Sequence, residues 1–100
     1  MPFLKHYPRS FNAISIQEHA PAVSGVYGLS NRSEWLFIGE TDNIQQTLLS
    51  HLRQPEPSAA AEQPPTGFVF EICDRAQRSG RQDRLVHEYG PTGNRYQPRP

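Results

Sequence analysis

The sequence predicts a mixed α/β domain, and two patterns predict it. Three apolar segments of strand length lie at 23–29, 34–39 and 67–73, and segments with helical spacing of apolar residues follow the second and the third. A short polar connection at 31–33 joins the first two strands, so we expect them to pair as an antiparallel hairpin. One hundred residues can bury one modest core, so we expect residues 1–100 to form a single domain.

The charge and cysteine content argue against some classes of protein. Ten basic and ten acidic side chains cancel. Neutrality counts against nucleic acid as the main partner, because proteins that grip phosphate backbones are usually basic. Cys73 is the only cysteine, so an internal disulfide is impossible, and no apolar run reaches membrane-spanning length. We therefore expect a protein of the reducing cytoplasm that has no membrane partner.

The N-terminal part carries weak signals. Residues 1–13 mix aromatic residues with two prolines, and we expect an irregular arm there. A short helix is predicted at 15–20, with Ser15 as its N-cap and Glu18 completing a capping box. Pro21 lies beyond the end of this helix.

Alternation along the second strand assigns its side chains to two faces. Trp35 and Phe37 are predicted to share one face, and Leu36 and Ile38 the other. Aromatic residues in hairpin strands usually pack in the core or against the neighbouring strand. We therefore interpret Trp35 as a structural residue.

A helix is predicted directly after the hairpin. Asp42 is placed to be its N-cap, and Gln45 completes a capping box. The positions that share one face of this helix and should pack on the sheet are Ile44, Leu48, Leu49 and Leu52. The segment 54–66 is rich in Pro and Ala, and we expect a mobile surface loop within the domain.

A last helix is predicted from Gly80 or Arg81 to Tyr89, where Gly90 ends it, and a polar tail follows at 92–100. The spacing of apolar residues in this helix defines an inward stripe.

Gln82 lies on that stripe with Leu85 and Tyr89. A buried amide needs hydrogen-bond partners. Either Gln82 caps the helix start together with Ser79, or this part of the stripe faces a polar site. Taken alone, the local pattern favours the cap.

Two triplets carry a resemblance to a known family. Gly25-Val26-Tyr27, then Phe37-Ile38-Gly39, a capped helix and a Pro-x-x-Asn element at Pro91 and Asn94 appear in order. This arrangement resembles the GIY-YIG nuclease family, and in particular the N-terminal cleavage domain of the bacterial excinucleases. The resemblance implies a three-stranded antiparallel sheet flanked by helices.

The resemblance also implies a catalytic set, which this sequence keeps only in part. Members of the family hydrolyse DNA phosphodiesters with one divalent metal ion. Tyr27 matches the first family tyrosine, whereas Phe37 replaces the second and lacks its hydroxyl group. Glu40 stands where a basic residue often follows the second triplet, and Thr47 stands at the position of a phosphate-binding arginine. Gln82 stands at the position of the glutamate that binds the metal ion.

These substitutions predict a fold without its hydrolytic activity. A neutral amide is a weak ligand for a hard divalent ion, and losing one charge-stabilising donor typically costs about 10²–10³ in rate. We therefore expect no cofactor, and Mg²⁺ or Mn²⁺ only if the chain is a nuclease after all.

The residual role implied by the resemblance is binding, to DNA or to a protein partner. The residues we assign to such a surface are Gly39, Glu40, Asn94, Arg81 and Arg84. The alternative is an active endonuclease, alone or completed by a partner. A structural or interaction protein without a link to nucleic acid stays open as a third class.

Other polar residues are candidates to replace the missing groups. Arg53 and Asp83 are rotated away from the relevant helix faces. His51 and His87 could ligate a metal ion, but histidines near helix ends are more often solvated or favourable to the helix dipole. Glu40 could also act as a ligand if the pocket were rearranged.

Four arginines recur at every third position, at Arg75, Arg78, Arg81 and Arg84. They form either a solvated face paired with nearby acids or a patch that contacts phosphates. The acids nearest in sequence are Asp74, Asp83 and Glu88. The neutral overall charge favours the solvated face slightly.

Overall fold

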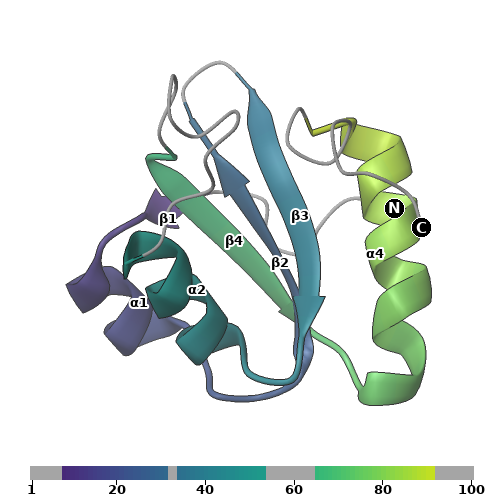
Figure 1. The fold of residues 1–100 in the computed structure, drawn as a ribbon, viewed down its shortest axis with the longest axis horizontal. Helices are drawn as coiled ribbons and strands as arrows, with labels where there is room; N and C mark the ends of the chain where they lie inside the picture. Colours follow the sequence, from purple (N-terminus) through teal and green to yellow (C-terminus); the bar gives the residue numbers. More distant parts are fainter. Residues whose placement is uncertain (1–7, 32–33, 54–64, 92–100) are drawn as a thin grey trace.

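The computed structural model describes residues 8–31, 34–53 and 65–91 (Figure 1). The elements in chain order are β1 (Arg9–Ser10), α1 (Ala13–His19), β2 (Gly25–Ser30), β3 (Trp35–Thr41), α2 (Ile44–Arg53), β4 (Gly67–Ile72) and α4 (Arg75–Tyr89). Three predictions lie wholly or partly outside the described part of the chain. They are residues 1–7 of the predicted arm, residues 54–64 of the predicted loop, and the tail 92–100.

The strands form one antiparallel sheet in the order β1-β4-β2-β3, covered on one face by α1 and α2 and on the other by α4 (Figure 1). The α/β class and the antiparallel hairpin are confirmed. The described sheet has four strands instead of three, because Arg9 and Ser10 pair with the start of β4. A two-residue strand is too short to show a period in the sequence.

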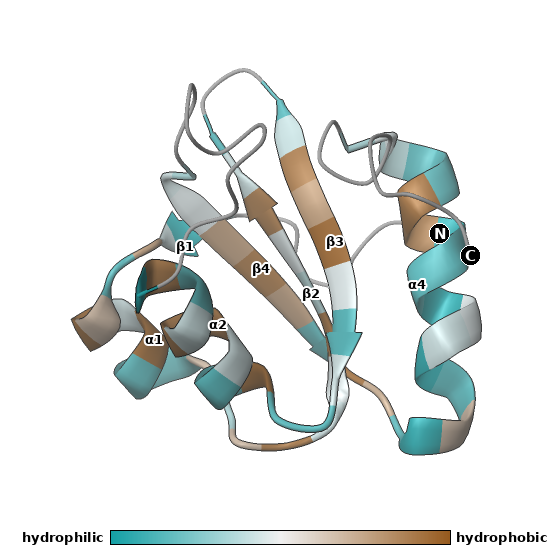
Figure 2. Ribbon diagram, viewed as in Figure 1, coloured by the Kyte–Doolittle hydropathy of each residue, from teal (hydrophilic) through white to brown (hydrophobic). Residues whose placement is uncertain are grey.

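Two apolar clusters hold the layers together. The cluster on the α1/α2 face includes Ile16, Tyr27, Ile44, Leu48 and Phe68, all at most 4% exposed. All four apolar positions predicted for α2 pack in this cluster or against it. The cluster on the α4 face is smaller and consists of Val26, Ile38, Val69 and Leu85. Accordingly α4 is largely hydrophilic in Figure 2, with its most hydrophobic part beside β3.

A bulge changes the faces of the second strand. The register between β2 and β3 shifts at Leu29 and Ser30, so that Ser30 lies opposite Trp35. Trp35 therefore packs on the α4 face against Tyr89, with ring centroids 4.6 Å apart, while Phe37 packs on the other face. The prediction that Trp35 and Phe37 share a face is wrong, because one extra residue reverses the alternation.

The first two helices are capped by asparagines. The Asn12 side chain accepts a hydrogen bond from the Ser15 N–H at 2.8 Å, and the Asn43 side chain accepts one from the Gln46 N–H at 2.9 Å. The predictions of Ser15 and Asp42 as N-caps are therefore wrong. The observed caps lie three residues before Ser15 and one residue after Asp42, where each asparagine satisfies one of the first free N–H groups.

Helix α4 begins earlier than predicted. Its N-cap is Asp74, which accepts a hydrogen bond from the Gln77 N–H at 3.1 Å, and it ends as predicted at Gly90, whose φ is 56°. Gly80 and Ser79 lie inside this helix, so the interpretation of Gln82 as part of a Ser79 cap is wrong. A glycine inside a helix is tolerated at a cost of about 1 kcal/mol, and Gly80 misled the sequence-based boundary.

Gly39 fixes how the hairpin packs. It lies opposite Tyr27 in the β2/β3 register, and the Tyr27 and Phe37 rings close over it. A Cβ added at Gly39 would lie 2.7 Å from the Tyr27 hydroxyl oxygen and 2.9 Å from a Phe37 ring carbon. A side chain at this position therefore requires the two rings to move.

We expect Gly39→Ala to lower the free energy of unfolding by about 1–3 kcal/mol, because overpacking displaces the two rings. Gly80→Ala is the matched control, since a Cβ at Gly80 meets no atom within 4 Å. It should raise stability by about 0.5–1 kcal/mol. Urea unfolding measures the free energy of unfolding of both variants. Equal changes in this free energy for the two substitutions would contradict this account of Gly39.

Candidate functional site

Tyr27 lies in an aromatic group on the α1/α2 face. The Tyr27 hydroxyl and His51 Nε2 are joined by a hydrogen bond of 2.9 Å. The ring of Phe37 completes the group, with centroids 6.1 Å from Tyr27 and 5.8 Å from His51. Imidazole can accept a phenol proton or donate one, so the pair offers a route for proton transfer.

Sequence reasoning considered His51 but missed its contact with Tyr27. The interpretation of His51 as a solvated histidine is wrong, because the ring is half-buried against Tyr27. A signal was present in the sequence: His51 follows Ile44 and Leu48 at helical spacing and so lies on the inward face of α2. His87, by contrast, is exposed in the last turn of α4.

Thr47 lies at the start of α2 and is bound within the fold. Its hydroxyl shares a hydrogen bond with the Thr41 hydroxyl, and Thr41 Oγ1 also accepts the Asn43 N–H at 3.0 Å. Thr47 thus helps to fix the turn between β3 and α2, and it carries no positive charge toward the Tyr27 group.

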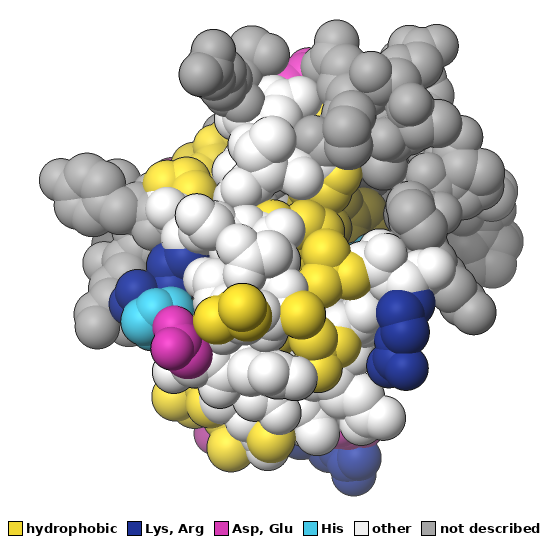
Figure 3. Space-filling model, turned by 90° about the vertical axis from the view of Figure 1, so that its left-hand side faces the viewer, with side chains coloured by type: hydrophobic (Ala, Val, Ile, Leu, Met, Phe, Trp, Pro, Cys, Tyr) yellow, Lys and Arg dark blue, Asp and Glu magenta, His cyan; other side chains and the backbone are white. Residues whose placement is uncertain are grey.

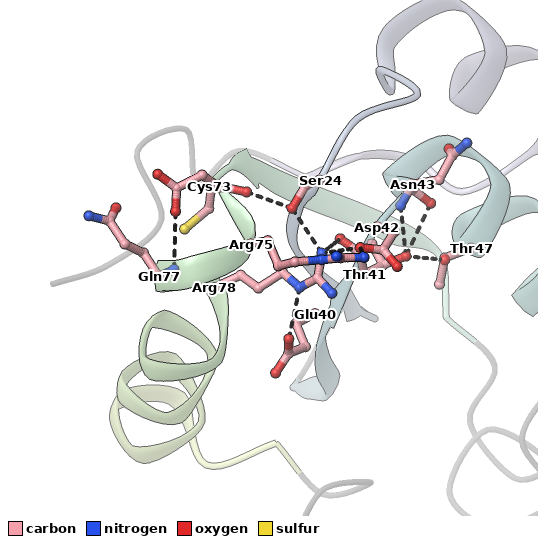
Figure 4. Close-up of polar contacts among 11 residues, drawn as sticks. Ser24, Glu40, Thr41, Asp42, Asn43, Thr47, Cys73, Arg75, Gln77 and Arg78 are labelled. Atoms are coloured by element: carbon pink, nitrogen blue, oxygen red, sulfur yellow. Dashed lines mark hydrogen bonds and ion pairs between the residues drawn. The ribbon is translucent and has the colours of Figure 1, made fainter.

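Glu40 points to the opposite face of the sheet, toward α4 (Figure 4). Arg78 Nε donates to Glu40 at 2.9 Å, and Arg78 Nη1 donates to the Ser24 hydroxyl at 3.0 Å, to the Thr41 carbonyl at 3.2 Å and to Asp42. The Arg78 side chain is only 13% exposed. Glu40 therefore has a structural role, as an anchor for the first half of α4.

Hydrogen bonding to Arg78 lowers the pKa of Asp42 below its ordinary value of 3.8, and the field of the guanidinium acts in the same direction. Asp42 also accepts a hydrogen bond from Arg75 at 3.3 Å. These contacts explain why Asp42 does not cap α2: its carboxylate is engaged by two arginines of another helix.

Arg81 is held on the same face by Glu71. Arg81 Nε and Nη2 donate to the two Glu71 carboxylate oxygens at 2.7 and 2.8 Å, a bidentate pair whose side chains are 13% and 11% exposed. These hydrogen bonds raise the pKa of Arg81. The arginines of α4 thus pair with the sheet and with the turn before α2, while Asp74 caps the helix. Arg84 is exposed.

Gln82 faces the sheet, as its place on the stripe predicts. Its Nε2 lies 3.5 Å from the carbonyl oxygen of Ile38 in β3, the limit of a hydrogen bond. Because β3 is the outer strand of the described sheet, Gln82 lies at the edge of the sheet.

The predicted site residues therefore form two groups on opposite faces of β3. Tyr27, Phe37 and Thr47 lie toward α2, and Glu40, Arg81 and Gln82 lie toward α4. Gly39 lies under the Tyr27 ring. Asn94 lies outside the described residues, and Arg84 makes no described contact with either group.

The donor set does not suit a divalent metal ion. Within residues 8–31, 34–53 and 65–91, no group of three or more His, Cys, Asp or Glu side chains is arranged to hold one. Gln82 offers a neutral amide, and the carboxylate of Glu40 is engaged by Arg78. None of the helices in these ranges is both long and apolar enough to cross a membrane.

Solved structures with the same arrangement exist. The GIY-YIG N-terminal endonuclease domain of UvrC from Thermotoga maritima, bound to magnesium, superposes with a TM-score of 0.66 over 79% of this chain and 94% of that domain, at 19% identity. A point mutant of the same domain superposes equally well, at 20% identity. The chain has the GIY-YIG fold. At these identities the likeness shows the fold of the GIY-YIG domain and not its chemistry.

Two proteins related in sequence are also excinuclease proteins. Excinuclease cho from Salmonella typhi is 34% identical over 80 residues, which cover 76% of this chain and 27% of that protein. UvrABC system protein C from a Hydrogenobaculum species is 38% identical over 45 residues, 45% of this chain and 8% of that protein. No family model matches the chain. The chain, with its GIY-YIG fold, thus resembles the UvrC N-terminal domain, and it spans about a quarter or less of the length of these relatives.

The lowered pKa of Asp42 predicts a specific loss of stability in acid. A depressed carboxyl pKa contributes stability that is complete above the ordinary value of 3.8 and is lost as the pH falls through the lowered pKa. We expect the melting temperature of the wild type to fall more steeply below about pH 4 than that of Asp42→Asn. Thermal melts between pH 7 and pH 2 measure this, with the exposed Asp83→Asn as control. Parallel curves for wild type and Asp42→Asn would contradict it.

Proposed function

We propose that this GIY-YIG domain binds DNA without hydrolysing it, in a process related to DNA repair. The fold of the UvrC endonuclease domain and the similarity to excinuclease cho support a nuclease-type ancestry and a nucleic-acid partner. The residues at the positions of the family catalytic set support the loss of hydrolysis.

The observation that carries the proposal is that the substituted positions are bound within the fold. Glu40 is ion-paired to Arg78, Thr47 is hydrogen-bonded to Thr41, and Gln82 faces the Ile38 carbonyl. A hydrolytic site needs a carboxylate for the metal ion and free cations for the developing charge. Thr47 and Gln82 supply neither, and the carboxylate of Glu40 is paired with Arg78. The other nearby arginine, Arg81, is paired with Glu71.

The proposed phosphate contact lies on α4 rather than on the α1/α2 face. Figure 3 shows the α1/α2 side of the molecule, where hydrophobic side chains gather at the centre and Lys and Arg side chains lie apart at the margins. Arg84 is exposed on α4, beyond the ion pairs of Arg78 and Arg81. We therefore place the phosphate contact at Arg84, and expect a weak, salt-dependent interaction.

The binding part of the proposal is tested by titrating a short labelled DNA duplex at several salt concentrations. We expect binding at low salt, and a slope of log K against log salt that falls by about 0.9 in Arg84→Ala, the value for one phosphate contact. Arg53→Ala, an exposed arginine on the other face, is the matched control and should leave the slope unchanged. Absence of any binding at low salt would refute a DNA-binding role.

A second candidate function is an endonuclease whose missing groups come from a partner. The hydrogen bond between Tyr27 and His51 favours it, because the domain has kept a tyrosine with a proton-accepting neighbour. In that case the domain would supply the group that positions or deprotonates the attacking water, and the partner would supply the metal ligand.

Nicking of supercoiled plasmid with Mg²⁺ or Mn²⁺ separates the two functions. We expect no nicking by the wild type, because the metal ligand and the phosphate cation are both absent. Thr47→Arg with Gln82→Glu asks whether the remaining site is intact, and any gain of nicking should disappear when His51→Ala is added. Dose-dependent nicking by the wild type that vanishes in Tyr27→Phe would instead establish the endonuclease.

A further inference from the structure

Among the described residues, strand β4 has an open edge beyond Phe68. Its inner side pairs with β2 along its whole length, from Gly67 to Ile72. On its outer side, β1 pairs only with Gly67 and Phe68, and the Phe11 N–H adds one bond to the Thr66 carbonyl. In the described part of the chain, no strand pairs with the outer side of β4 beyond Phe68.

The register shows which peptide groups point outward. The Cys73 N–H, directly after β4, donates a hydrogen bond of 3.1 Å to the carbonyl of Ser24, the residue before β2. Because alternate residues of an antiparallel strand direct their N–H and C=O groups to the same side, Glu71 and Val69 also face β2. Phe70 and Ile72 therefore present two N–H and two C=O groups at the open edge.

The residues that the structure describes at this edge give it little of the usual protection against pairing. Natural sheets blunt exposed edges with lysine, proline or bulges. Here Ile72 is apolar and 65% exposed, and the neighbouring carboxylate of Glu71 is held by Arg81 on the α4 side. Within residues 8–31, 34–53 and 65–91, the edge therefore combines peptide groups without a strand partner and an exposed apolar side chain.

A groove of about 690 Å³ runs beside this edge, between the end of β4 and the first half of α4. Its lining residues are Glu71, Ile72, Cys73, Asp74, Ala76, Gln77, Gly80, Arg81 and Arg84. The groove has room above Gly80, since a Cβ there would meet no atom within 4 Å. Two acidic and two basic residues line it, so their charges cancel.

We propose that the outer edge of β4 binds an extended segment of a partner protein, which adds a strand in line with β1. Peptide N–H and C=O groups at the spacing of Phe70 and Ile72 are satisfied in full by another extended chain. The partner segment carries an apolar side chain beside Ile72, and its next side chain enters the groove over Gly80. Because the charges of the groove cancel, it suits a peptide segment that is itself neutral.

Amide hydrogen exchange in the full chain tests the first half of the proposal. We expect the Phe70 and Ile72 amides to exchange fast and the Val69 and Glu71 amides to exchange slowly, although all four lie in one strand. Protection of Phe70 and Ile72 in the free protein would show that the chain's own residues cover the edge, and would overturn the proposal.

The second half is tested with a labelled octapeptide of alternating Thr and Val, flanked by Lys for solubility. We expect it to slow exchange at Phe70 and Ile72, and to bind at least about tenfold more tightly than the same peptide methylated at alternate amide nitrogens, the effect of about one lost hydrogen bond. Strand addition would be refuted if the two peptides bound equally, or if the peptide slowed amide exchange only in elements other than β4.

Gly80→Phe should fill the groove and weaken peptide binding by a similar factor. Ser79→Phe is the matched control, since Ser79 is the next residue of α4 and does not line the groove. Equal peptide affinity of the two variants would show that the groove takes no part. Because neither variant changes a charge, DNA titration of both keeps this result separate from the proposed DNA binding.

Discussion

The docking of α4 by two arginines is the interaction on which the rest of this domain depends. The apolar contacts of α4 come from its second half, at Leu85, Val86 and Tyr89. Its first half is joined to the sheet by Arg78 and Arg81, through Glu40, Asp42 and Glu71. A helix with so few apolar contacts cannot be positioned by burial alone. Ion pairs with nearly buried guanidinium groups instead fix the position of α4 along the sheet and its rotation about its own axis.

That docking decides what the candidate site contains. The rotation of α4 that brings Arg78 to Glu40 also brings Gln82, one turn later, to the outer edge of β3. The sheet then separates this side from the Tyr27, Phe37 and His51 group. The two halves of the candidate site meet only at β3, so the aromatic half can keep its geometry while the polar half changes its chemistry.

Much of the fold could be predicted from local signals. The hairpin, the four apolar positions of α2 and the end of α4 at Gly90 each follow from spacing or from one residue with a strong preference. Two of the errors share a cause, because they depend on contacts distant in sequence. Asp42 is drawn from its cap position by Arg78, and Trp35 changes face because of a bulge defined by the partner strand.

The candidate site shows the same difference between local signals and contacts distant in sequence. Gln82 could be placed on an inward face from its periodicity, but its contact with Ile38 required the sheet. His51 could have been recognised from its spacing after Ile44 and Leu48, and was missed because histidines near helix ends are usually solvated. The arginine spacing on α4 gave no sign of its partners, because Glu40 and Glu71 lie on separate strands.

The contact between Arg78 and Glu40 limits which residues position 40 can hold. A lysine at position 40 would face the guanidinium of Arg78 and leave Asp42 as the remaining carboxylate of that cluster. A basic residue after the second triplet would therefore disturb the docking of α4, unless position 78 changed as well. The acidic residue at position 40 is thus entrenched, because the architecture relies on it.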